Sequence, residues 1–263
     1  MQSLCGTRFN ILWVFLLDLD VLWREKLVGQ PLRDDIPIGK DALVLEVEIR
    51  LREIGSSHGR APTPLLVVHD GPDYARRTPL LRLLDAMVAA RELPPHRVAL
   101  LVPDDRRETY SASTPYSRAL VAALDQTAGR RARRVGLGSS LGALALLHAH
   151  RLEPRAFAGL FLQSGSFFRR RTDAQESRFP RFSRVDRFVG SVLGGRDGVR
   201  PVPTTITCAL DEENYANNAT VAQALAEQGY PVDFHAARGG HDWPTWRRAL
   251  ESHLVPLLAR AWR

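Results

Sequence analysis

Cysteine is scarce in this chain, and long apolar runs are missing from it. Its 263 residues include two cysteines, Cys5 and Cys208, which are too few for a disulfide framework. We therefore expect two free thiols in a reducing compartment, which favours a cytoplasmic location. A transmembrane helix needs about 20 apolar residues. The apolar run at residues 11–17 is far shorter, so no membrane span is predicted.

The amino-terminal part lacks a clear pattern. Residues 11–17 are also short for the core of a secretory signal, and Asp18 and Asp20 follow them directly. We therefore expect residues 1–40 to be an extension whose order the sequence does not determine, and residues 41–263 to form one domain.

Positive charge is abundant but not organised into a nucleic-acid motif. The net charge is +7, with 44% hydrophobic and 25% charged residues, as in ordinary globular proteins. Helix-turn-helix and zinc-ligand spacings are missing, and the arginines are not interleaved with aromatic residues, so we expect no nucleic-acid partner. A positive surface favours an anionic small-molecule substrate.

Strand and helix patterns alternate from about residue 65 onward, after strands alone. Short continuous apolar runs are typical of buried parallel strands, and helical periodicity separates them. This order predicts an α/β class, with a mostly parallel central sheet, an antiparallel start and helices on both faces. We expect strands at residues 42–51, 65–69, 97–102, 134–137, 157–163, 204–210 and 232–236, helices at residues 79–91, 117–128, 141–150, 217–228 and 246–258, and an irregular basic segment at residues 167–201.

One serine stands in the context of a nucleophile. Residues 138–142 (Gly-Ser-Ser-Leu-Gly) match the G-x-S-x-G pattern, as do residues 55–59, which lead into prolines rather than a helix. Ser140 instead follows a predicted strand and opens a predicted helix, which is the setting of the nucleophile elbow in α/β-hydrolases. A strained serine backbone requires tiny residues two positions before and after, and Gly138 and Gly142 meet that need. We therefore predict that Ser140 is a nucleophile in an α/β-hydrolase fold.

The general base and the acid should follow the serine in chain order. His241 comes after the predicted strand 232–236, in a glycine-rich loop, and is the expected base. The acid should follow the strand 204–210, where it would hold the imidazole in the required tautomer. Asp211, Glu212 and Glu213 all stand there, and position alone does not choose among them.

Two backbone N–H groups are expected to stabilise an oxyanion. The first is that of Leu141, at the start of the helix after the serine. The second should come from residues 70–74, where Gly71 permits close approach of a substrate and Pro72 has no N–H to donate. Such a site implies no organic cofactor and no metal.

Together these segments resemble the enterochelin-esterase-like branch of the esterase D family, within the α/β-hydrolase superfamily. The resemblance covers roughly residues 64–263 and implies hydrolysis of carboxylic esters, in the named members the trilactone of a catechol siderophore. It implies Glu212 as the acid and Arg107 as a substrate contact. The matching segments are residues 69–71 (His-Asp-Gly), 138–142, 163–167 (Gln-Ser-Gly-Ser-Phe), 212–214 (Glu-Glu-Asn), 217–218 (Asn-Asn) and 239–243 (Gly-Gly-His-Asp-Trp).

The expected activity is therefore that of a serine esterase that passes through an acyl-enzyme. Its partner would be a small-molecule ester, and an anionic one such as a ferric siderophore fits the arginines at residues 169–171. We expect Tyr74 and Arg169, with Arg107, to bind the substrate. Two alternatives remain open: an acyltransferase of the mycolyltransferase type, and a non-catalytic binding protein on a hydrolase scaffold. The sequence does not indicate the oligomeric state.

Overall fold

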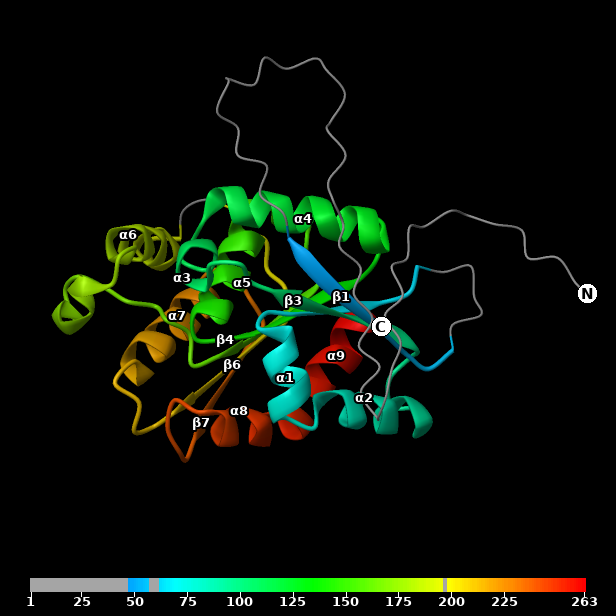
Figure 1. The fold of residues 1–263 in the computed structure, drawn as a ribbon. Helices are drawn as coiled ribbons and strands as arrows, with labels where there is room; N and C mark the ends of the chain where they lie inside the picture. Colours follow the sequence, from blue (N-terminus) through cyan, green and yellow to red (C-terminus); the bar gives the residue numbers. More distant parts are fainter. Residues whose placement is uncertain (1–46, 57–61, 196–197) are drawn as a thin grey trace, which may run out of the picture.

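A seven-stranded sheet forms the centre of the computed structural model, which describes residues 47–56, 62–195 and 198–263 (Figure 1). The strand order is β1-β3-β2-β4-β5-β6-β7, with β1 antiparallel to β3 and every other pair parallel. The predicted fold class is thereby confirmed. The strands are β1 (Glu48–Ile54), β2 (Leu65–Val68), β3 (His96–Val102), β4 (Arg134–Ser139), β5 (Gly159–Gln163), β6 (Thr204–Ala209) and β7 (Val232–Ala237).

Helices cover both faces of the sheet. In Figure 1, α4 lies above the strands, and α2 and α8 lie below them. None of the helices among the described residues is long and apolar enough to cross a membrane. The helices are α1 (Gly71–Arg77), α2 (Leu80–Ala89), α3 (Arg106–Thr109), α4 (Thr114–Ala128), α5 (Leu141–Leu152), the 3-10 helix η1 (Ala174–Arg178), α6 (Phe182–Leu193), α7 (Tyr215–Glu227), α8 (Trp243–Ala249), the π-helical turn η2 (Leu250–Leu254) and α9 (Val255–Trp262).

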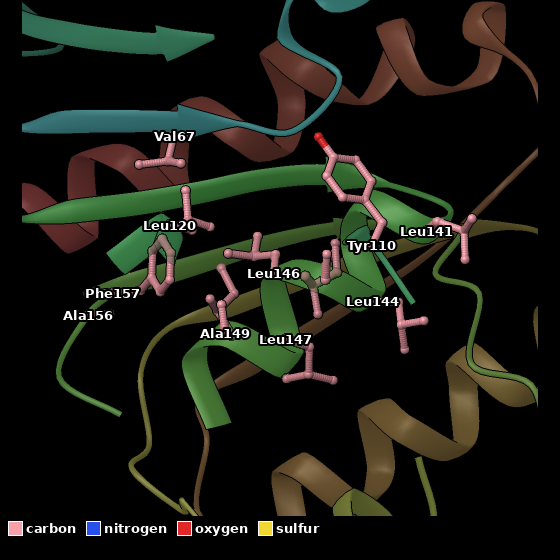
Figure 2. Close-up of a cluster of buried hydrophobic side chains, with 14 of the residues drawn as sticks. Val67, Tyr110, Leu120, Leu141, Leu144, Leu146, Leu147, Ala149, Ala156 and Phe157 are labelled. Carbon is pink, nitrogen blue, oxygen red and sulfur yellow. The ribbon is translucent and has the colours of Figure 1, made fainter. Parts of the chain in front are cut away.

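Each face of the sheet buries its own apolar cluster. The larger cluster joins the sheet to α4, α5, α6 and α7, and Figure 2 shows part of it, with Val67 of β2, Leu120 of α4 and Leu146 of α5. The smaller cluster joins the opposite face to α1, α2, α8 and α9. Burial on both sides explains why β2, β4, β5 and β6 have mainly apolar or small residues rather than an alternating pattern, with Arg134 and Gln163 as exceptions at strand ends.

The structure adds the short helices α1 and α3, which were not predicted, and corrects the sequence predictions in three further places. The segment 167–201 is not irregular throughout, because it contains α6, whose Phe182, Val185, Val189 and Val192 form one buried helical face between arginines. The closing helix is divided into α8, η2 and α9, and Pro256, which has no N–H, follows the π-helical turn.

The third correction concerns the first strand, β1, which ends at Ile54 rather than at residue 51. Residues 42–46 lie outside the described residues, as do Cys5, the predicted extension at residues 1–40, and Ser57 of the competing serine pattern. The division into an extension and one domain therefore stays a prediction.

Candidate active site

Ser140 occupies a sharp turn between β4 and α5. Its backbone angles are φ 56° and ψ −122°, a region that side-chain-bearing residues rarely adopt, and α5 begins at the next residue. Such strain persists only where the surrounding structure enforces it, and it is concentrated at functional sites. The turn therefore has the form expected of a nucleophile elbow.

The two flanking glycines are required by close contacts at this turn. A Cβ atom on Gly138 would lie 2.6 Å from the carbonyl carbon of Gly142, and a Cβ atom on Gly142 would lie 3.0 Å from the Cβ of His69. Real Cβ contacts are longer than the first of these distances, so alanine at position 138 would force the turn open. Gly138 is thus required by the turn itself, and Gly142 by its close packing against His69.

An acid–histidine pair lies on the same edge of the sheet. Glu212 follows β6 and His241 follows β7, and the Glu212 Oε2 atom is 2.7 Å from His241 Nδ1. Glu212 also accepts hydrogen bonds from Ser164 Oγ at 2.7 Å and from the Ala209 N–H at 3.0 Å. Asp211 and Glu213 are exposed, so of the three neighbouring acids Glu212 is the one that contacts the imidazole.

The environment of Glu212 favours its charged form. Its side chain is only 2% exposed, whereas that of His241 is 42% exposed. Burial disfavours the carboxylate, but the hydrogen bonds that it accepts, first among them that from His241, outweigh burial and hold the pKa of Glu212 below its ordinary value. A charged carboxylate can only accept, so Nδ1 of the neutral imidazole donates to it and Nε2 is left as the basic nitrogen.

Other histidines near the sheet are buried and inert. Burial, with the nearby Arg106 charge, lowers the pKa of His69 to about 3. Burial is also the largest cause of the lowered pKa values of His148 and His150, each about 4. These three side chains stay neutral at ordinary pH inside the fold, whereas His241 is accessible at the edge.

The loops after β4 and β5 are joined at the serine. The Ser140 N–H donates to the Gln163 carbonyl, and the Ser166 N–H donates to the Ser140 carbonyl. The Ser140 hydroxyl lies 3.1 Å from Ser166 Oγ, and within the described residues this is its hydrogen-bond partner, rather than His241. Hydrogen bonds used in catalysis are often formed only when substrate is present, so this resting geometry is compatible with a serine–histidine step.

Ser164 and Trp246 contact the Glu212–His241 pair at this edge of the sheet, and sequence reasoning did not identify either as a site residue. Trp246 Nε1 donates to Ser164 Oγ at 3.0 Å, and the same hydroxyl donates to Glu212. The Trp246 ring packs edge-on against the His241 ring, with centroids 5.1 Å apart. The loops after β5, β6 and β7 are thereby linked through side chains that orient the imidazole. The sequence carried one signal for Trp246, because a tryptophan stands three residues after the start of the helix that follows His241.

Two N–H groups are available to bind an oxyanion. Leu141 is the first residue of α5, so its N–H has no partner within the helix. In the segment 70–74, the N–H of Asp70 donates to the Tyr110 hydroxyl, and those of Asp73 and Tyr74 donate to the Asp70 carbonyl. Pro72 has no N–H group. Within the described residues, Gly71 therefore carries the one N–H of this segment that has no hydrogen-bond partner.

The predicted substrate residues have three different settings. Tyr74 is fully buried, and its hydroxyl donates to Gln163 Oε1 at 2.7 Å, so it belongs to the core, which corrects the expectation of a substrate contact. Arg107 is exposed on α3. Its neighbour Arg106, which sequence reasoning missed, forms a two-pronged ion pair with Asp70.

Arg169 lines a cavity of about 390 Å³ between α6 and α7. Its Nε donates to Asp186 Oδ1 at 3.1 Å. The cavity combines apolar walls with a polar rim, and its lining residues are Phe167, Val189, Leu193, Val221, Arg169, Arg171, Thr172, Asn217 and Thr220. Among all the described residues, no group of three or more histidine, cysteine, aspartate or glutamate side chains is arranged to hold a metal ion.

Comparisons with known proteins agree with this fold. No family model matches the chain. The iron(III) enterobactin esterase of Dickeya dadantii is 30% identical over 220 residues, which cover 77% of this chain and 49% of the relative, so the chain spans about half the length of this relative.

Solved structures show the same architecture. Enterochelin esterase from Shigella flexneri superposes with a TM-score of 0.67 and 21% identity, over 83% of this chain and 56% of that one. A fluorophosphonate-binding serine hydrolase of Staphylococcus aureus superposes with a TM-score of 0.58 and 16% identity, over 81% and 92% of the two chains. The resemblance noted in the sequence is confirmed: the chain has the α/β-hydrolase fold and is similar in sequence to the iron(III) enterobactin esterase of Dickeya dadantii.

Proposed function

We propose that this protein is a serine carboxylic-ester hydrolase. The observation that carries the proposal is the placement of a strained serine after β4 and of the Glu212–His241 pair after β6 and β7, on one edge of the sheet. Parallel strands bring their carboxyl ends to the same edge, where α/β proteins bind ligands. The homology to an iron(III) enterobactin esterase supports the same chemistry.

The proposed reaction is acyl transfer in two steps. His241 Nε2 accepts the proton of the Ser140 hydroxyl while the oxygen attacks the ester carbonyl, and Glu212 stabilises the imidazolium that forms. The N–H groups of Leu141 and Gly71 bind the negatively charged oxygen. His241 then protonates the leaving alcohol, and water, deprotonated by the same imidazole, hydrolyses the acyl-enzyme and regenerates the serine.

We further propose an anionic ester with an apolar or aromatic group, of the siderophore trilactone type, as the substrate class. The cavity between α6 and α7 has an apolar wall that includes Phe167 and a rim with Arg169 and Arg171. Phe167 directly follows Ser166, whose hydroxyl contacts Ser140, so one residue of the cavity wall is next in sequence to the proposed site. Within the described residues Arg169 has its charge partly balanced by Asp186, which leaves Arg171 as the more available cation.

The reaction is tested with Ser140→Ala. The wild-type protein should hydrolyse p-nitrophenyl acetate and be labelled by a fluorophosphonate probe, and the variant should do neither while its circular dichroism spectrum is unchanged. Equal hydrolysis by the variant would reject Ser140 as the nucleophile.

The substrate class is tested separately, by comparing ferric enterobactin with a neutral p-nitrophenyl ester in the wild type and in Arg171→Gln. We expect kcat/KM for the anionic ester to fall in the variant and that for the neutral ester to stay constant. An equal effect on both esters would reject the anionic class and leave the hydrolase proposal standing.

Two coarser expectations are also proposals. Because the described residues share one sheet with a buried cluster on each face, we propose that residues 41–263 are one domain. Cys208 is a free, buried thiol, which agrees with a reducing compartment and supports the proposed cytoplasmic location.

A further inference from the structure

Asp70 has an unusual backbone conformation beside the proposed oxyanion site. Its φ of 53° and ψ of 37° are left-handed, a conformation that residues with a side chain adopt uncommonly. Two contacts hold it there. Its N–H donates to the Tyr110 hydroxyl, and its carbonyl accepts from the first turn of α1. The conformation of Asp70 sets the direction of the next N–H, which is that of Gly71.

A charged clamp fixes the side chain of this residue. Arg106 Nε donates to Asp70 Oδ1 at 2.9 Å, and Arg106 Nη2 donates to Asp70 Oδ2 at 2.9 Å, so the pair is two-pronged. The Asp70 side chain is 8% exposed. A Cβ atom on Gly142 would lie 3.4 Å from Asp70 Oδ2, so the carboxylate is close to the first turn of α5 as well.

The same guanidinium group reaches the elbow. Arg106 Nη2 lies 3.5 Å from the carbonyl oxygen of Ser139, the residue before the nucleophile. The guanidinium also lies over the Tyr110 ring, 5.6 Å from its centroid, and Tyr110 is the acceptor for the Asp70 N–H. One arginine thus contacts the loop that bears Gly71 and the strand end that bears the nucleophile.

We infer that Arg106 is a positioning residue for the oxyanion site: by clamping Asp70 it sets the Gly71 N–H at a fixed place relative to Ser140. This inference rests on the proposed function. Donors that are preorganised for the developing charge act on the transition state more than on the bound ester. Loss of the clamp should therefore lower kcat and leave KM nearly constant.

The test is Arg106→Gln assayed with p-nitrophenyl acetate, a neutral ester that does not need a cation for binding. Removing an oxyanion donor costs roughly 100- to 1000-fold in kcat, so a misplaced donor should cost about 10- to 100-fold. KM should change less than about twofold. The inhibition constant of a trifluoromethyl ketone, which forms a tetrahedral adduct with serine, should rise by the factor by which kcat/KM falls.

Arg134→Gln is the matched control. Arg134 donates to Asp125 at 2.6 Å in another partly buried arginine–aspartate pair, and it stands at the opposite end of β4 from the serine. This variant should lose stability without loss of kcat. Asp70→Asn should reproduce the Arg106→Gln effect, and the double variant should be no worse than either single one.

Two rescue experiments separate positioning from folding. Arg106 is 37% exposed, so millimolar guanidinium ion should restore part of the kcat of Arg106→Ala. Arg106→Lys keeps the charge but not the two-pronged contact and should retain only part of the kcat, so it serves if the glutamine variant does not fold.

An unchanged kcat, or a raised KM with constant kcat, would overturn the inference, and the second result would make Arg106 a substrate contact instead. A wild type that fails to hydrolyse the ester, or that equals Ser140→Ala, would reject the proposed function itself.

Discussion

The most informative single substitution is Glu212→Gln, which changes charge at nearly constant shape. Glu212 Oε1 accepts from Ser164 Oγ at 2.7 Å and from the Ala209 N–H at 3.0 Å, and Oε2 faces His241 Nδ1 at 2.7 Å. In the glutamine variant the amide oxygen must keep the first two contacts, because the backbone N–H can only donate. The amide NH₂ is then directed at His241.

This orientation reverses the tautomer of the histidine. Nδ1 must accept a hydrogen bond from the new amide, so the single proton of the neutral ring moves to Nε2. A protonated Nε2 cannot accept the proton of Ser140, and the same change in a known catalytic triad lowers kcat about 10⁴-fold. We expect a loss of about 10³- to 10⁴-fold here, which corresponds to about 4–5 kcal/mol in the activation free energy. The free energy of unfolding should fall by only about 1–2 kcal/mol, because every hydrogen bond keeps a partner.

The assay is kcat for p-nitrophenyl acetate, with urea unfolding as the measure of stability. Asp211→Asn and Glu213→Gln are the controls, since both side chains are exposed neighbours of Glu212. Each should retain kcat within about twofold, as expected for surface positions. The reasoning fails if Glu212→Gln remains within tenfold of the wild type while folded, or if one of the neighbouring variants shows the larger loss.

Three other changes test single contacts. Burial, aided by nearby arginine charges, lowers the pKa of His150 from 6.5 to about 4, so the unfolded chain takes up its proton first as pH falls. The free energy of unfolding should therefore decrease between pH 6.5 and pH 4, by about 3 kcal/mol from this group. Urea unfolding should show that this free energy depends less steeply on pH in His150→Gln than in the wild type. Equal slopes would contradict the assignment. Gly138→Ala places a Cβ 2.6 Å from the carbonyl carbon of Gly142 and should lower the free energy of unfolding by about 2–3 kcal/mol or more, measured by urea unfolding. A stability near that of the wild type would refute the steric argument. Ser166→Ala removes the resting partner of the Ser140 hydroxyl and should change kcat less than tenfold, whereas Ser140→Ala should lower kcat on the order of 10⁶-fold. A loss in Ser166→Ala as large as that in Ser140→Ala would mean that Ser166 takes part in the chemistry.

Local patterns predicted most of the strands and helices because each depends on a short stretch of chain. Four of the central strands are buried on both faces, and this burial favours mainly apolar or small residues along each of them. Prediction failed at α6, where arginines separate the buried Phe182, Val185 and Val189 and conceal the helical face. It also failed at Tyr74, because a tyrosine after a strand has the same local pattern whether it enters the core or the site.

The sequence by itself predicted the elbow around Ser140 and the chain order of the proposed catalytic groups. The elbow is a local structure, and the need for Gly138 arises from contacts within five residues, whereas Gly142 is required by its approach to His69, 73 residues earlier in the chain. The family resemblance already favoured Glu212, but its contact with His241, and the choice of Arg106 over Arg107, were decided only by the tertiary structure. These side chains are selected by partners that lie 29 and 36 residues away in the chain, on other strand ends. Which of several adjacent charges meets such a partner depends on the direction of each side chain after its strand, and residue order does not encode that direction.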